Sequence, residues 1–155
     1  MSNIALQKTK FVRVIDPAAI VDNAAYTTEE IDTLGYDHLT IVCYLGATDI
    51  AMTALAVQES DTSGSGFATV TGLDANGDTN TDGVAAELPT ATDDNGMVVF
   101  EVDLRYRKRY IDLDATAGNG ATGTFLSAIG ILSSKSSGLA DVSATERGAL
   151  DILRV

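Results

Sequence analysis

Short runs of apolar residues at alternate positions recur along the chain, separated by clusters of turn-forming residues, and this pattern constrains the fold most. The clearest run, Asp37–Leu45 (DHLTIVCYL), is apolar on both faces of a strand, which predicts a central strand in a packed sheet. About eight short strands at this spacing predict an all-β fold, an antiparallel β-sandwich or jelly-roll-like domain. In chain order, the strands are expected at Phe11–Ile15, Ala24–Asp32, Asp37–Leu45, Met52–Glu59, Phe67–Val70 and Met97–Leu104. Two more are expected within Asp103–Leu132, joined by a glycine-rich turn: the first carries the basic residues Arg105, Arg107, Lys108 and Arg109, and the second is Thr122–Leu132.

The length and composition indicate a single domain. A chain of 155 residues, of which 45% are hydrophobic, can bury a core without a metal ion or a disulfide. We expect an N-terminal arm over residues 1–10, a β-sandwich domain over 11–134 and a C-terminal tail over 135–155. Ser143 and Glu146 have capping-box spacing, which favours a short helix in the tail. Good helix propensity makes a helix the alternative for Met52–Glu59, and a helical turn from Thr28 is the alternative within Ala24–Asp32.

The charge balance argues against nucleic acid as the main partner. The chain has 22 Asp and Glu against 10 Lys and Arg, a formal net charge of −12, whereas binding to phosphates needs clustered positive charge. The apolar runs are far shorter than the roughly 18 residues needed to span a membrane, so no membrane partner is expected. Residues 1–10 do not have the layout of a secretory signal peptide. The single cysteine, Cys43, predicts a small core residue rather than half of an intramolecular disulfide.

Catalytic motifs do not emerge from the sequence. His38 is the only histidine, so any Ser-His-Asp or Cys-His arrangement would depend on it, and nothing in the sequence directs a nucleophile towards it. One histidine and one cysteine do not make a zinc site. We therefore expect no enzymatic activity and no cofactor.

An acidic stretch, residues 72–96, contains the one local motif that suggests a metal. Asp78, Asn80 and Asp82, followed by glycine, match the first half of an EF-hand calcium loop. The twelfth position is Pro89 instead of the bidentate glutamate, and the flanking sequences do not predict helices. The stretch is expected to be a solvated surface loop, with a weak cation site at these three residues as the alternative.

The densest group of basic residues lies on the predicted strand that follows Met97–Leu104. On a strand, Arg105, Arg107 and Arg109 share one face, and Tyr106, Lys108 and Tyr110 share the other. One interpretation is local ion pairing, with Asp103, Asp112 and Asp114 as the nearest acids along the chain. The other is a contact patch for an acidic protein surface, since arginine binds carboxylates bidentately. Candidate contact residues are therefore Arg105, Tyr106, Arg107, Lys108, Arg109 and Tyr110, with Lys8 and Lys10 of the N-terminal arm.

Two segments, Gly35–Val70 and Phe100–Leu132, resemble a group of small structural proteins that are encoded beside the capsid genes of tailed bacteriophages. The likeness is carried by LGATDIAM, QESDTSGSGF and the pair DLRYRKRY and TAGNGATGT, which are scaffold and turn signatures. The N-terminal arm and the tail after Lys135 lie largely outside the match.

The resemblance implies a head decoration (cement) protein, a β-sandwich on the outside of the capsid that stabilises contacts between neighbouring capsomers. It implies the major capsid protein as partner, self-association as a trimer or dimer on the shell, synthesis in the bacterial cytoplasm, and a final location on the exterior of the virion. The alternatives are another virion component, such as a head-completion or tail protein, and a carbohydrate-binding β-sandwich module. The latter normally shows exposed aromatic side chains, and this chain has 5 Tyr, 4 Phe and no Trp.

Overall fold

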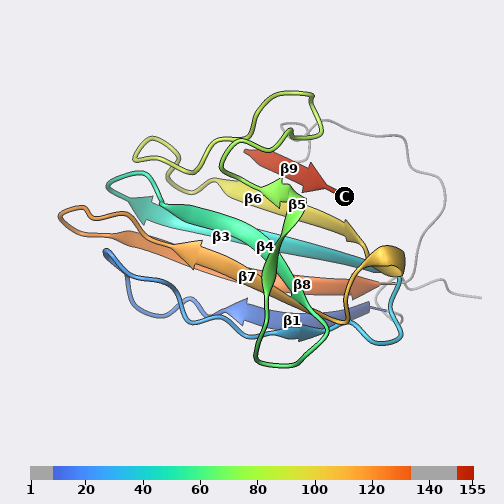
Figure 1. The fold of residues 1–155 in the computed structure, drawn as a ribbon. Helices are drawn as coiled ribbons and strands as arrows, with labels where there is room; N and C mark the ends of the chain where they lie inside the picture. Colours follow the sequence, from blue (N-terminus) through green and yellow to red (C-terminus); the bar gives the residue numbers. More distant parts are fainter. Residues whose placement is uncertain (1–8, 134–149) are drawn as a thin grey trace, which may run out of the picture.

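The computed structural model describes residues 9–133 and 150–155, which form two β-sheets packed face to face (Figure 1). One sheet has five strands in the order β1-β8-β3-β6-β9, and the other has four in the order β2-β7-β4-β5. A single turn of 3-10 helix, η2, covers Leu104–Tyr106. The strands are β1 (Thr9–Ile15), β2 (Ile31–Asp32), β3 (His38–Thr48), β4 (Ala54–Ser60), β5 (Ala68–Asp74), β6 (Met97–Asp103), β7 (Tyr110–Thr116), β8 (Thr124–Ser133) and β9 (Asp151–Arg154).

The pairing of the strands identifies the sandwich as a jelly roll. β1 pairs with β8, β2 with β7, β3 with β6 and β4 with β5, all antiparallel, so the first eight strands form one long hairpin folded over on itself. β9 is added outside this set and runs parallel to β6. The predicted all-β sandwich is therefore confirmed, with β3 at the centre of the five-stranded sheet as expected from its sequence.

The core lies between the sheets and is built from the inward-pointing residue of each alternating pair. Along β6, and along β3 as far as Leu45, every second residue is buried, which is the pattern of strands with one face on a core. The largest fully buried side chains are Phe100, Ile31, Leu39, Ile41, Leu45, Met52, Leu55, Leu73, Ile111, Leu132, Ile152 and Leu153.

The glycine-rich connection between β7 and β8 is fixed by a carboxylate from another turn. Asp49 Oδ2 accepts backbone N–H groups from Ala121 at 2.6 Å and Thr122 at 2.5 Å, and the Thr122 bond contributes most to lowering the pKa of Asp49. Gly123 has φ +99°, and a Cβ there would overlap the carbonyl oxygen of Val21. Glycine is needed at this point because the conformation and the space both exclude a side chain.

Two strand predictions were wrong in detail. Ala24–Asp32 forms a strand only at Ile31–Asp32, with one isolated bridge at Ala25, because its other residues have no continuous partner strand. The basic cluster does not lie on a strand: alternation stops at Leu104, and Asp103 caps η2 by accepting the Arg105 N–H. The region from 107 to 109 connects η2 to β7, so the predicted two faces of arginine and tyrosine do not exist.

The C-terminal prediction also needs correction. Residues 151–154 were placed in a tail outside the sandwich, but they form β9 of the five-stranded sheet. Four residues are too few to show alternation, and their strand conformation comes from pairing with β6. The helix expected from Ser143 and most of the N-terminal arm lie outside the described residues, whereas Thr9 and Lys10 begin β1. Residues 75–96 contain only an isolated bridge between Thr79 and Ala85, so this part of the acidic stretch is a long connection as predicted.

Candidate protein-contact surfaces

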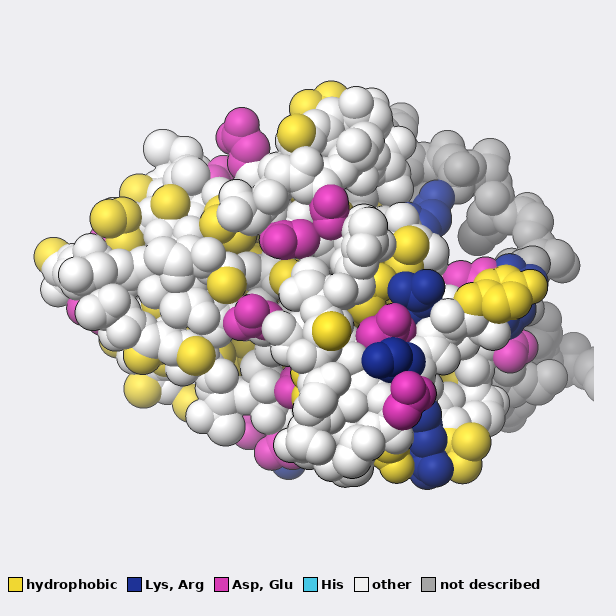
Figure 2. All heavy atoms as spheres, in the orientation of Figure 1, with side chains coloured by type: hydrophobic (Ala, Val, Ile, Leu, Met, Phe, Trp, Pro, Cys, Tyr) yellow, Lys and Arg dark blue, Asp and Glu magenta, His cyan; other side chains and the backbone are white. Residues whose placement is uncertain are grey.

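The outward face of the four-stranded sheet is polar and acidic. Gln58 on β4 is opposite Asp112 on β7 and donates to Asp114 at 3.4 Å. Thr69 on β5, opposite Gln58, is exposed. In the space-filling view, acidic side chains are scattered among polar ones, and basic side chains gather towards one end beside acidic ones (Figure 2). This is the ordinary surface of a soluble β-sandwich, with apolar residues inside and polar residues outside.

The outward face of the five-stranded sheet is apolar instead. The strand register aligns Ile129 of β8, Val42 of β3, Val99 of β6 and Ile152 of β9 in one row across the sheet. We call this surface the apolar face; it consists of Phe11, Val42, Tyr44, Met97, Val99, Phe125, Ile129 and Ile131, whereas Ile152 in the same row is buried.

Several large side chains of the apolar face are open to solvent. The exposed fractions are 56% for Phe11, 51% for Tyr44, 44% for Ile129 and 43% for Phe125. Single exposed apolar residues are normal, but a contiguous patch on one sheet indicates an interaction site. Charges next to it are compensated within the chain, since Arg13 pairs with Asp16 at 3.3 Å and Arg154 donates to Glu101. The apolar face is therefore close to neutral in a protein with net charge −12.

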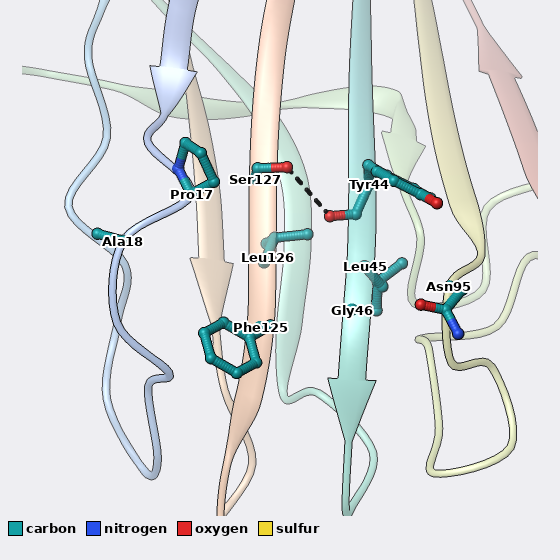
Figure 3. A pocket seen from close by; sticks show the side chains of 9 residues that line it. All are labelled: Pro17, Ala18, Tyr44, Leu45, Gly46, Asn95, Phe125, Leu126 and Ser127. Carbon is teal, nitrogen blue, oxygen red and sulfur yellow. Dashed lines mark hydrogen bonds between the residues drawn. The ribbon is translucent and has the colours of Figure 1, made fainter.

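An open cavity of about 210 Å³ lies at one end of the apolar face (Figure 3). It is lined by residues of β3 and β8 together with the segment after β1, and its most prominent side chains are Tyr44 and Phe125. Gly46 lets Phe125 pack closely against β3, because a Cβ there would approach the Cβ of Phe125 to 2.9 Å. Ser127 Oγ donates to the Tyr44 carbonyl at 3.4 Å and ties the two strands together beside it. A cavity of this kind suits one apolar side chain of a partner.

The basic cluster lies at one end of the sandwich, and each of its cations has an acidic partner. Arg105 binds Asp103, and Arg107 lies 3.6 Å from Glu59. The remaining two pairs are Lys108 with Asp61 at 3.8 Å and Arg109 with Asp32 at 2.8 Å. Local pairing was one of the two interpretations of the cluster; Asp103 is a partner as expected, whereas the others are Glu59, Asp61 and Asp32 rather than Asp112 and Asp114.

The pair between Arg109 and Asp32 has the best geometry of the four. Arg109 donates from Nε to Asp32 Oδ1 at 2.9 Å and from its terminal nitrogen to Oδ2 at 2.8 Å, a bidentate arrangement that joins β2 to the start of β7. These bonds, with a further N–H from Leu34, lower the pKa of Asp32 to about 2, and the same pair raises the pKa of Arg109. The Arg109 guanidinium also lies 5.1 Å from the centre of the Tyr110 ring.

Among the candidate contact residues, Tyr106 is highly exposed, and Lys10 is exposed as well. The Tyr106 side chain is 84% exposed at the tip of η2, and Lys10 is exposed on the edge strand β1. Lys8 lies outside the described residues. The structure thus brings the six residues of the cluster together at one end of the molecule, apart from the apolar face that sequence reasoning missed.

Two of the three candidate metal ligands, Asp78 and Asn80, hold turns through their side chains. Asp78 Oδ2 accepts backbone N–H groups from Gly72 and Asp74, each at 2.9 Å. Asn80 Oδ1 accepts from Asp82 at 3.0 Å, and its amide donates to Asp151 at 2.7 Å. Within residues 9–133 and 150–155, no group of three or more His, Cys, Asp or Glu side chains is arranged to hold a metal ion.

Neither His38 nor Cys43 belongs to a reactive arrangement in the described part of the chain. His38 is at the start of β3, 3.3 Å from the Thr40 hydroxyl. Cys43 is fully buried in the core, and burial raises the pKa of its thiol to about 12, which keeps it protonated and unreactive. No helix among the described residues has the length and apolar character of a membrane span.

Comparison of the chain with protein-family models, with curated proteins and with solved structures finds no match. The surfaces of the molecule and the resemblance in its sequence are therefore the basis for assigning a function.

Proposed function

We propose that the protein is a structural virion protein, a decoration or cement protein that binds the outer surface of a phage capsid through its apolar face. The observation that carries this proposal is the neutral, apolar outward surface of the five-stranded sheet on a protein that is otherwise strongly acidic. The resemblance of Gly35–Val70 and Phe100–Leu132 to structural proteins encoded beside capsid genes supports a viral partner. The jelly roll is compatible with it, because viral capsid domains commonly have this fold, although the fold alone does not imply the function.

The apolar face has the properties that an interface core needs. Full burial of a large apolar side chain is worth about 1.5–3 kcal/mol, so covering the exposed half of each of Phe11, Tyr44, Phe125 and Ile129 is worth about 1 kcal/mol per residue. Aromatic residues at the centre of an interface, inserted beside a pocket, are typical binding hot spots. Tyr44 and Phe125 have this arrangement around the open cavity.

In this proposal the basic cluster is a peripheral contact. Its cations are already paired with acids of the same chain and are half-exposed, so they offer less to a partner than free arginines do. Among the residues of the basic cluster, Tyr106 is the one best placed to make this peripheral contact, because its side chain is highly exposed. The major capsid protein is the proposed partner, with self-association on the shell. The protein takes no part in catalysis and needs no cofactor.

The proposal is tested by co-sedimentation of the purified protein with undecorated heads, with the heat stability of the heads measured alongside. Saturable binding that raises the temperature at which heads break is expected. Absence of binding to intact heads would contradict the decoration role and favour a head-completion or tail component.

Replacing Arg105, Arg107 and Arg109 together by alanine tests the peripheral role of the basic cluster. Because exposed ion pairs contribute about 0–1 kcal/mol each, we expect a small loss of thermal stability. Binding to heads should weaken less than it does when a residue of the apolar face is replaced. A complete loss of binding with an unchanged melting temperature would instead make the cluster the main docking site.

A carbohydrate-binding module is the second candidate, and one observation favours it. The Tyr44 and Phe125 side chains border an open cavity, and aromatic rings at the surface of lectin-type jelly rolls can stack on sugars. Titration with a panel of glycans, monitored through the NMR signals of the aromatic rings, distinguishes the two candidates. Saturable shifts confined to Tyr44 and Phe125 would support sugar binding, and unchanged spectra would reject it.

A further inference from the structure

β9 is an addition to a jelly roll that is already complete. The eight strands β1 to β8 make all four of the nested antiparallel pairs, and β9 then joins the free edge of β6 as a parallel strand (Figure 1). Its four residues pair with Val98–Glu101 of β6. The fold of the first eight strands therefore provides a site for β9 and does not depend on where β9 comes from.

The site for β9 is deep and specific. Leu153 is fully buried in the main core, and Ile152 is 1% exposed on the opposite side of the strand, where it packs on Met97 and Val99. Burial of two such side chains is worth about 1.5–3 kcal/mol each. An unoccupied site would expose the corresponding apolar surface of β6, so the site must be filled by some strand.

Backbone hydrogen bonds hold β9 from both sides. On the β6 side, Leu150 donates to the Met97 carbonyl at 2.6 Å, and Val155 exchanges bonds with the edge of β6, accepting from Asp103 at 3.0 Å. On the other side, Thr81 of the long connection between β5 and β6 donates to the Ile152 carbonyl at 3.0 Å. β9 thus lies in a slot between β6 and this connection, as in strand-addition complexes.

Side chains fix the register of β9 in the slot. Arg154 donates from Nε to Glu101 at 2.7 Å, and Asn80 donates to Asp151 at 2.7 Å. Gly96 leaves room for the Leu150 side chain, which a Cβ at that position would overlap. These contacts are specific for the sequence LDILRV. Another copy of the same chain has the same sequence, so its β9 would fit the slot equally well.

The length of chain before β9 allows it to reach a neighbouring molecule. β8 ends at Ser133, level with the end of β6 but separated from it by β3, whereas β9 begins beside the start of β6. The two points are about 20 Å apart along the sheet and about 14 Å apart across it. Sixteen residues, 134–149, connect them. A chain of this length can extend to about 55 Å at most, about twice the distance required.

We propose that β9 is an exchangeable strand, and that in the self-associated protein the β9 of one copy occupies the slot of a second copy. The contacts in the slot are the same whether β9 comes from its own chain or from a second copy. The balance between the two arrangements therefore depends only on the connection 134–149 and on the local concentration of neighbouring copies. Exchange is unfavourable in dilute solution and is favoured where copies are held side by side, as on a shell. The inference concerns association between copies and does not depend on the identity of the shell.

Disulfide trapping tests the exchange with the full chain. Glu101 and Arg154 are register partners on β6 and β9, so cysteines at these positions are close enough to form a disulfide. The native Cys43 is buried and does not interfere. Chains carrying Glu101→Cys are mixed with chains carrying Arg154→Cys, unfolded together under reducing conditions, refolded over a range of concentrations and oxidised. We expect a covalent dimer linked between positions 101 and 154, increasing at least tenfold from micromolar towards millimolar protein.

Two controls make the result decisive. A chain with both substitutions should form the disulfide within a monomer at low concentration, which checks the register of β9. A mixture of Arg154→Cys with Thr69→Cys, an exposed strand position on the other sheet, measures random cross-linking. If the double variant oxidises but the mixture gives no more dimer than the Thr69→Cys control at any concentration, β9 stays within its own chain and the inference is wrong. Failure of the double variant to oxidise would overturn the slot geometry itself.

Discussion

Replacing Tyr44 by lysine should weaken docking strongly while leaving the fold intact. Tyr44 is 51% exposed on the central strand of the five-stranded sheet, opposite Ser127 and Met97, so no charged side chain is directly beside it. On docking, the exposed half of the ring would be covered, a gain of about 1 kcal/mol that the substitution removes. A lysine ammonium buried without a partner adds a further cost of about 2 kcal/mol or more. Because 1.4 kcal/mol is a tenfold change in affinity, we expect binding to heads to weaken by about a hundredfold or more.

Stability should change much less than binding. Strand propensities span about 1 kcal/mol, and the Tyr44 ring is not part of the core, so the free energy of unfolding should fall by about 1 kcal/mol at most. Thr69→Lys is the matched control, because it makes the same charge change at an exposed strand position on the acidic side of the sandwich. Both variants are compared with the unmodified protein by sedimentation isotherms with heads and by denaturant unfolding. Equal binding by Tyr44→Lys and Thr69→Lys would refute docking through the apolar face.

Three further predictions concern the fold. Gly123→Ala should destabilise the protein by about 1–3 kcal/mol, since φ is +99° and a Cβ overlaps a neighbouring carbonyl. Gly77→Ala, at φ +104° in open space, should cost less stability. Equal losses of melting temperature in the two variants would contradict this reasoning. Cys43, with its pKa raised to about 12, should resist thiol reagents until the protein unfolds. Above about pH 8.5 the thiol loses its proton in the unfolded state but not in the folded state, so the unfolding free energy should fall by up to about 1.4 kcal/mol per pH unit. The Cys43→Ala variant should lack this part of the slope below about pH 10, and an unchanged slope would exclude the thiol as its source. The pKa of Asp32 is lowered to about 2 by Arg109, so the unfolded state binds a proton more readily than the folded state between about pH 4 and 2. The free energy of unfolding should decline over that window by about 0.2–1 kcal/mol, a small amount because the pair is exposed. In acid unfolding curves Asp32→Asn should show a smaller decline, and an equal decline would mean that the pair contributes nothing.

The alternation of apolar residues was sufficient to predict the fold class and most strands. β3 as far as Leu45 and β6 over Met97–Asp103 bury every second side chain, so the local sequence is enough to predict these strands. Ile31–Asp32 and Asp151–Arg154 are too short to carry such a pattern, and they are strands because a distant partner supplies hydrogen bonds. The sequence predicted a β-sandwich or jelly-roll-like domain but not the order of its strands, because that order depends on these long-range pairings.

The candidate site illustrates a different limit. The sequence showed that the Asp37–Leu45 run is apolar on both faces, which predicted a central strand, and β3 is central. It did not show that the second apolar face is left open, because exposure depends on whether another layer covers the sheet. The basic cluster was conspicuous in the sequence, yet its acidic partners Asp32, Glu59 and Asp61 come from segments about 50 to 80 residues away, and only the fold brings them together.

Hydroxyl-radical footprinting of the protein, free and bound to undecorated heads, tests the central claim most directly. Tyr44 and Phe125 on the apolar face are open to solvent in the free protein, and so is Tyr106 in the basic cluster. If the apolar face docks on the capsid, binding should strongly reduce oxidation of Tyr44 and Phe125 and leave Tyr106 much less protected. Protection of Tyr106 with unchanged oxidation of Tyr44 and Phe125 would contradict the account and place the contact at the basic cluster.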